Sequence, residues 1–144
     1  MKLNLIVDTE SEEEISITVH KPYPWIDTIK AIIEEKNGAF LGYKDGEIIS
    51  ISLSNAICFT IESSTVFVYT KQDKFRLKER LYQIEKNVGR DFLKINQSTI
   101  VNVNYIDRFK VSFGGALMVK MKNGFTDYVS RRQIKAVKER IGIK

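Results

Sequence analysis

The sequence predicts a mostly β protein with a small α contribution, in which antiparallel sheets follow a small N-terminal β-β-α unit. From residue 39 onward, short alternating runs of apolar residues are separated by turn-forming pairs such as Asp45-Gly46 and Asn123-Gly124. Helical periodicity is confined to short stretches. With 144 residues, of which 43% are hydrophobic, the chain is long enough for one domain with a core and a small appendage.

Residues 1–38 form the expected N-terminal unit. Residues 3–7 and 15–19 each alternate in the manner of a half-buried strand, and an acidic turn separates them. A helix should begin near Trp25 and end at Asn37-Gly38, because this pair is typical of a helix end. Such a small unit buries little surface. We therefore expect it to dock on the rest of the chain or on another protein, in dimerisation or in regulation.

Residues 39–144 form the expected β domain. The apolar runs predict strands at residues 40–44, 47–53, 57–62, 66–70, 92–95, 100–103, 108–113, 117–121 and 126–129. Two amphipathic stretches predict helices at Arg76–Asn87 and Arg131–Arg140. The first of these should bury Leu77 and Leu81 on one face.

The charge is divided unevenly between the two parts. The whole chain carries a formal net charge of +5. Residues 1–38 hold four basic and eight acidic residues, a net charge of −4. The remaining residues hold 19 basic and 10 acidic residues, a surplus of +9. A partner that is a polyanion, such as a nucleic acid, is therefore expected to bind the β domain.

Side chains of the kind that most enzymes use are scarce. His20 is the only histidine, and the only cysteine, Cys58, is distant from it in sequence and lies in an apolar run. The acids Glu12 to Glu14 are successive, so they point in different directions and fit a solvated turn better than a metal site. The pair Gly114-Gly115 lies between two strands and does not open a helix, as a phosphate-binding loop would. We expect no enzyme, no metal, no cofactor and no small-molecule substrate.

The sequence lacks the features of membrane and secreted proteins. No run of about 18 apolar residues is found. The first residues have neither the basic start nor the long apolar stretch of a secretory signal. A cytoplasmic protein is expected.

A polar loop between two apolar runs carries side chains suited to DNA. It contains Lys94, Asn96, Gln97, Ser98 and Thr99. The amides can pair with an adenine edge in the major groove, and lysine and serine can bind phosphates. The same residues are also common in an ordinary polar turn that connects two strands, and this alternative stays open.

The segment from Phe92 to Ile106 resembles the LytTR family of DNA-binding domains, in which a Phe, a basic residue, a His-Arg-Ser or His-Asn-Ser triplet and Val-Asn follow one another. Val129-Ser130-Arg131 is similar to the family's Val-Ser-Arg ending before its last helix, and Ile61–Ser64 is similar to its Ile/Phe-Glu-Ser element. The resemblance covers roughly residues 39–143 and is most specific in the last fifty.

The resemblance implies an elongated antiparallel β fold that places loops into successive major grooves of double-stranded DNA. It implies base reading by Asn96 or Gln97 and by Arg131 or Arg132. The residues expected to contact DNA, including those for phosphate oxygens, are Ser64, Thr65, Lys94, Asn96, Gln97, Ser98, Ser130, Arg131, Arg132 and Lys135. Histidine is usual at Asn96, arginine is common at Gln97, and the turn after Glu62 is short and uncharged. The bases read should therefore differ from those of other members.

The resemblance also implies partners. Repeated half-sites in the DNA and a homodimer, at least on DNA, are expected. Many members follow a phosphoreceiver domain, and residues 1–38 are too few to contain one. The chain is thus expected to be a short, response-regulator-like member, and it is similar to regulators that a small inhibitory membrane protein sequesters. Alternatively, Trp25 and Ile29 simply pack on the β domain.

Two other classes of function compete with a duplex-binding regulator. A binder of single-stranded nucleic acid or RNA would present exposed aromatic rings, but Phe109, Phe113, Phe125 and Tyr128 alternate as strand residues and are expected in the core. A protein-interaction adaptor would act through the acidic N-terminal unit and would not bind DNA.

Overall fold

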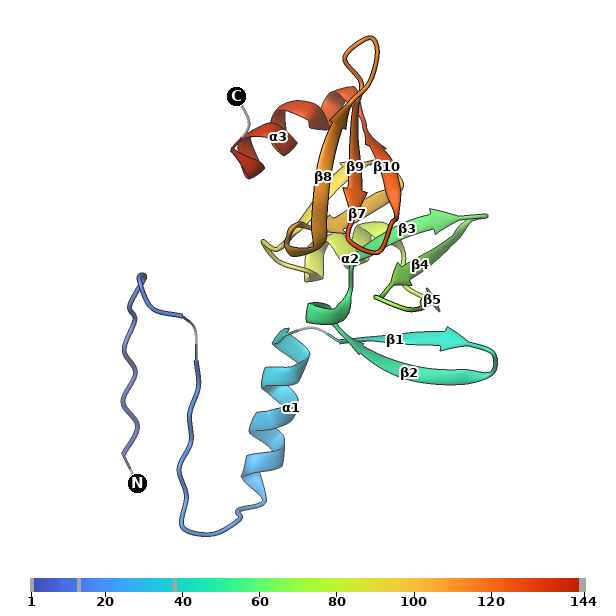
Figure 1. Cartoon of the computed structure of the whole chain (residues 1–144). Helices are drawn as coiled ribbons and strands as arrows, with labels where there is room; N and C mark the ends of the chain where they lie inside the picture. Colours follow the sequence, from blue (N-terminus) through green and yellow to red (C-terminus); the bar gives the residue numbers. More distant parts are fainter. Residues whose placement is uncertain (1, 13, 38, 143–144) are drawn as a thin grey trace.

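The computed structural model describes residues 2–12, 14–37 and 39–142. Within this part of the chain, ten strands form two antiparallel sheets (Figure 1). The seven-stranded sheet has the order β2-β1-β5-β4-β3-β7-β6, and the three-stranded sheet has the order β10-β9-β8. The strands are β1 (Ala39–Lys44), β2 (Glu47–Ser52), β3 (Cys58–Glu62), β4 (Thr65–Tyr69), β5 (Lys74–Leu77), β6 (Phe92–Asn96), β7 (Thr99–Asn102), β8 (Ile106–Val111), β9 (Leu117–Met121) and β10 (Thr126–Val129).

Three helices accompany the sheets in the described residues. They are α1 (Trp25–Asn37), α2 (Leu81–Asn87) and α3 (Arg131–Ile141). None is long and apolar enough to cross a membrane. The mostly antiparallel β architecture that the sequence predicts is confirmed.

Two hydrophobic cores lie on opposite faces of the larger sheet. On one face α2 packs its Leu81 and Ile84 against Phe59 and its neighbours. The other face is covered at the β3, β7 and β6 side by the smaller sheet and α3, with Cys58 among the buried residues. Cys58 and Phe59 are consecutive in β3 and face different cores because side chains alternate along a strand. Burial raises the pKa of the Cys58 thiol, so it remains neutral.

The helix predicted at Arg76–Asn87 is wrong at its beginning. Residues 74–77 form β5, and α2 starts only at Leu81. Phe75 and Leu77 alternate with exposed neighbours and pair with β4 in the registers Val68↔Phe75 and Val66↔Leu77. Leu77 is therefore buried in the same core as Leu81, but from a strand, because an open edge of β4 was available to pair with.

The N-terminal unit also differs from the expectation. The strands predicted at 3–7 and 15–19 are absent, and both segments run without a sheet partner. Their apolar side chains are exposed, as at Leu3 and Ile15, because a lone pair of strands has no face to pack against. Helix α1 is confirmed, and Trp25 stacks on Tyr23 at the end of α1 that points away from the sheets (Figure 1). Glu13 and Gly38, named above, lie outside the described residues.

Two of the four aromatic residues expected in the core are exposed. Phe109 and Phe125 do pack against the second core. Phe113 is fully exposed, because it lies beyond β8 in the Gly114-Gly115 turn, where no facing layer exists. Tyr128 is 53% exposed on the outward face of β10.

Replacing Ile84 by alanine should lower the free energy of unfolding by about 2–5 kcal/mol, because the side chain is wholly buried and leaves a cavity. The matched control Ile48→Ala removes a side chain that is 63% exposed. Its effect should stay within about 0.5 kcal/mol. Urea unfolding of the two variants measures the difference, and equal losses would contradict this packing.

Candidate nucleic-acid interface

Three turns lie together at one end of the molecule: the β3–β4 turn, the β6–β7 turn and the junction between β10 and α3. Ile61 in β3 donates its backbone N–H to the carbonyl of Ser98, at 2.9 Å. Ser130 donates its backbone N–H to the carbonyl of Ile95, at 2.8 Å. Backbone hydrogen bonds therefore connect the β6–β7 turn to both of the others. The three regions that the sequence analysis picked out are brought together.

Asn96 uses its side chain to hold these turns in place. Its Nδ2 donates to the Asp127 carboxylate at 3.0 Å and to the Tyr128 carbonyl at 2.8 Å. Its Oδ1 accepts the backbone N–H of Ser98 at 2.8 Å. Both N–H groups of the amide are thus occupied within the protein. Asn96 joins the β6–β7 turn to β10.

The Asp127 carboxylate collects further hydrogen bonds. The Thr99 hydroxyl donates to Asp127 Oδ2 at 2.7 Å, and Tyr128 donates its backbone N–H to Oδ1 at 2.8 Å. Thr99 is buried and its Oγ1 lies 2.8 Å from that of Thr60. Because the Thr99 proton goes to Asp127, Thr60 is the donor of that pair. The resulting chain runs across β3, β7 and β10. The sequence analysis missed Thr60 and Asp127, whose only signal was a polar residue at a covered strand position.

The remaining predicted site residues differ in exposure. Gln97 and Ser98 are exposed at the tip of the β6–β7 turn, between the anchored Asn96 and Thr99. Arg131, Arg132 and Lys135 are exposed on α3, and Ser64 is exposed in the β3–β4 turn, whereas Thr65, Lys94 and Ser130 are half-buried. The Nζ of Lys94 lies 3.6 Å from the Glu85 carboxylate.

Helix α3 presents its cations because its apolar side faces the second core. Val137 is fully buried there, and Ile134 packs against the same cluster. The junction is closed by backbone hydrogen bonds from Gln133 and Ile134 to the Ser130 carbonyl, at 2.9 and 3.1 Å. The Ser130 hydroxyl makes no capping hydrogen bond. Arg131 and Arg132 therefore occupy the first turn of a fixed helix, on its exposed side.

The β3–β4 turn is tight and stiff. Ser63 and Ser64 have φ of 49° and 67°, the left-handed pair that a two-residue hairpin turn requires. Just before it, Glu62 accepts hydrogen bonds from the Tyr69 hydroxyl and, at 2.9 Å, from Lys74. These two donors hold the pKa of the Glu62 carboxyl below its usual range. Burial raises the pKa of Tyr69.

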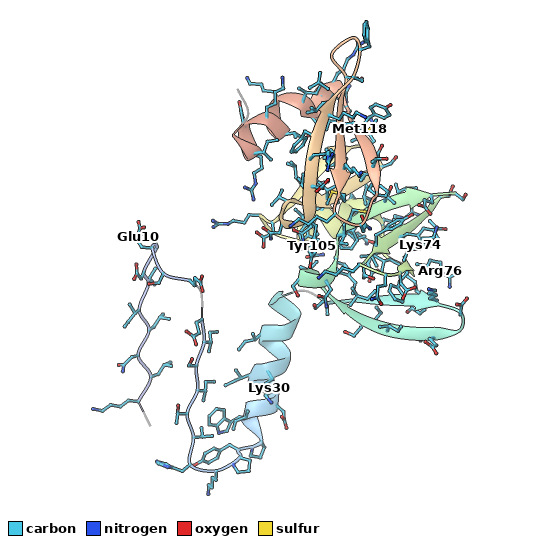
Figure 2. All side chains as sticks on the ribbon, viewed as in Figure 1. Glu10, Lys30, Lys74, Arg76, Tyr105 and Met118 are labelled. Carbon is cyan, nitrogen blue, oxygen red and sulfur yellow. The ribbon has the colours of Figure 1, made fainter. Side chains whose placement is uncertain are left out.

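A groove of about 900 Å³ extends from these turns along the start of α2. It contains three cations that the sequence analysis did not select: Arg76, Lys78 and Arg80. The reason is the helix predicted over Arg76–Asn87, which would have distributed these side chains around its circumference. Strand β5 instead aligns them. Figure 2 shows Arg76 and Lys74 on the same side of the larger sheet.

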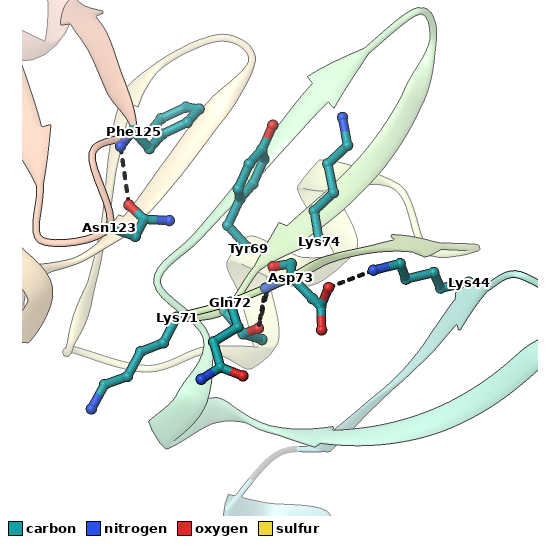
Figure 3. A pocket seen from close by; sticks show the side chains of 9 residues that line it. Lys44, Tyr69, Lys71, Gln72, Asp73, Lys74, Asn123 and Phe125 are labelled. Carbon is teal, nitrogen blue, oxygen red and sulfur yellow. Dashed lines mark hydrogen bonds and ion pairs between the residues drawn. The ribbon is translucent and has the colours of Figure 1, made fainter.

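A second hollow, of about 410 Å³, lies at the other end of β4, between the β4–β5 and β9–β10 turns (Figure 3). Lys44 pairs with Asp73 there, and the Phe125 N–H donates to the Asn123 side chain at 3.1 Å. None of the predicted site residues lines this hollow. It is separate from the three turns.

The Glu62 contacts predict a pH dependence of stability. The pKa of Glu62 is lowered in the folded chain, so its contribution is complete above the unfolded value near 4.5 and is lost as the pH falls through the folded value. Glu62→Gln should therefore destabilise the protein at neutral pH and progressively less below about pH 4.5. Thermal unfolding at several pH values measures this. In a Tyr69→Phe background the dependence should shrink, and an unchanged dependence would contradict the assignment.

Comparison with known proteins agrees with this geometry. The model of the LytTr DNA-binding domain matches residues 46–142. Two proteins of Staphylococcus aureus, from strains NCTC 8325 and COL, are described as HTH-type transcriptional regulators and are 36% identical over 148 residues, with 99% of this chain and of each relative covered. The solved LytTr DNA-binding domain of a Bacillus cereus protein has a TM-score of 0.68 at 19% identity, covering 72% of this chain and 96% of that chain. The chain belongs to the LytTR family of DNA-binding domains.

Proposed function

We propose that this DNA-binding regulator recognises specific sequences of double-stranded DNA by inserting its three turns into the major groove. The observation that carries the proposal is the gathering of exposed polar and basic side chains on turns from three separate elements, cross-linked by hydrogen bonds. Turns on a rigid scaffold keep reading groups in a constant relative position. The +9 surplus of residues 39–144 supplies the attraction to phosphates.

In this proposal Gln97 reads a base and Asn96 positions it. The Asn96 amide is occupied by Asp127, Tyr128 and Ser98, so little of it is left for a base edge. Gln97 is exposed and lies between two anchored residues. A glutamine amide can donate to N7-adjacent N6 chemistry in the correct sense only on adenine, where it accepts from N6–H and donates to N7.

Arg131 and Arg132 are the proposed readers of guanine, because an arginine fork fits guanine O6 and N7. Both are exposed in the first turn of α3. The remaining predicted contacts are assigned to phosphate oxygens: Ser64, Thr65, Lys94, Ser98, Ser130 and Lys135. These contacts would orient the protein on the duplex.

We further propose that two protomers bind repeated half-sites, with residues 1–38 available for dimerisation or regulatory docking in the cytoplasm. The exposed Leu3, Leu5 and Val7 support docking by this segment, because such side chains favour a protein partner. A duplex with two copies of the selected sequence should bind two protomers with positive cooperativity. Analytical ultracentrifugation measures the stoichiometry, and one protomer on such a duplex would contradict the proposal.

Selection of bound duplexes from a random pool tests sequence specificity. The full-length chain should enrich one motif, and a chain without residues 1–38 should enrich the same motif if the β domain alone reads the bases. Failure of both forms to enrich any motif would overturn the proposed function.

Substitution of the proposed readers should lower affinity for the selected duplex by about 1–3 kcal/mol each and leave affinity for random DNA nearly unchanged. Gln97→Ala and Arg132→Ala are the variants. Their matched controls are Gln72→Ala, in the β4–β5 turn away from the interface, and Arg90→Ala, before β6. Titration with both duplexes measures the ratio. Equal losses on the two duplexes would reassign the residue to the phosphate backbone.

A single-strand binder is the competing function, and one observation favours it. Phe113 and Tyr128 are exposed aromatic rings on the smaller sheet, and such rings can stack on unpaired bases. Competition between the selected duplex and its separate strands distinguishes the two. Stronger binding of the single strands, reduced by Phe113→Ala, would support the alternative.

A further inference from the structure

The groove beside the three turns carries an excess of positive charge. Its lining includes four cations, Arg76, Lys78, Arg80 and Lys94, and one carboxylate, Glu79. Lys94 is close to the Glu85 carboxylate, whereas Arg76, Lys78 and Arg80 form no ion pair within the described residues. Three uncompensated cations on one wall favour an anionic ligand.

Strand geometry aligns these cations toward the candidate interface. Arg76 and Lys78 are two residues apart, so they point to the same face at a spacing of about 7 Å. The pairing Val66↔Leu77 places Lys78 beside Thr65, the first residue after the β3–β4 turn. Arg80 follows at the start of α2, where its backbone N–H donates to the Gln83 side chain at 2.9 Å. The row of cations therefore ends at the turns.

An aromatic ring holds two of the cations. The Lys78 ammonium lies 4.6 Å from the centre of the Tyr43 ring, and the Arg76 guanidinium lies 5.9 Å from it. Tyr43 in β1 is paired with Arg76 in β5. Such cation–π contacts restrict the side chains without neutralising them. The charges remain available to a ligand in a restricted position.

We propose that this groove binds the sugar-phosphate backbone of the DNA that flanks the bases read by Gln97. This inference rests on the proposed function. Continuity supports it, because Ser64, Thr65, Lys94 and Gln97 line the same groove as Arg76, Lys78 and Arg80. A duplex seated on the three turns would extend its backbone along this wall. The flanking contact is independent of base sequence and adds affinity and register.

The test compares two duplexes with the same selected sequence. One ends at that sequence, and the other extends it by about one helical turn, 10 base pairs, on each side. The wild-type chain should bind the longer duplex more tightly. The triple variant Arg76→Gln, Lys78→Gln and Arg80→Gln should lose this gain, about tenfold in affinity, while it binds the shorter duplex as the wild type does. The salt dependence on the longer duplex should fall by about 0.9 per lost contact.

A control triple variant removes equal charge elsewhere: Lys86→Gln, Lys110→Gln and Lys120→Gln, all exposed. It should preserve the gain with length. Glu79→Gln, which removes the carboxylate from the groove, should increase that gain. Thermal unfolding confirms that each variant is folded.

The outcomes separate this inference from the proposed function. If the wild type binds neither duplex, the proposed function fails. If it binds both equally, or if both triple variants lose the gain alike, the groove inference alone is overturned. A rise in affinity on removing the groove cations would also overturn it, and would indicate an acidic protein segment as the occupant.

Discussion

The Asp127 carboxylate is the interaction on which the candidate interface depends. It accepts hydrogen bonds from Asn96 and Thr99, and Thr99 is bonded to Thr60 in turn. The side chains of three strands are thereby joined through one anion at the edge of the second core. A half-buried carboxylate with several donors is stable as a charge, and the same donors would be left unsatisfied without it. The positions of the exposed turn residues follow from this constraint.

Strand β3 determines how the cores support the turns. Phe59 faces α2, whereas Cys58 faces the smaller sheet. Both are fully buried, so β3 is fixed from two sides and its end at Glu62 is held by Tyr69 and Lys74. The Ser63-Ser64 turn therefore has little freedom. A short, uncharged turn of this kind contributes shape and phosphate contact more than a long basic loop would.

The groove and the turns divide affinity and specificity between them. Gln97 and Arg132 lie where bases can be discriminated, and Arg76 and Lys78 lie where only the backbone can be bound. Because Glu62 and Asp73 neutralise Lys74 and Lys44, the uncompensated cations are confined to the side near the turns. Charge that total composition only counts is thus directed by pairing toward one end of the sheet.

The sequence by itself determined the β class, the β1–β2 hairpin at Asp45-Gly46, the terminal helix and the turns that carry Gln97 and Arg132, because these depend on local alternation and turn chemistry. Only the tertiary structure decided that Arg76 lies in a strand, that Asn96 is occupied by Asp127, and that residues 3–7 have no sheet partner. Each of these depends on a neighbour far away in sequence: the edge of β4, the side chain of β10, and the absence of a covering face. Local patterns specify which residues can pair, and packing selects the pair that forms.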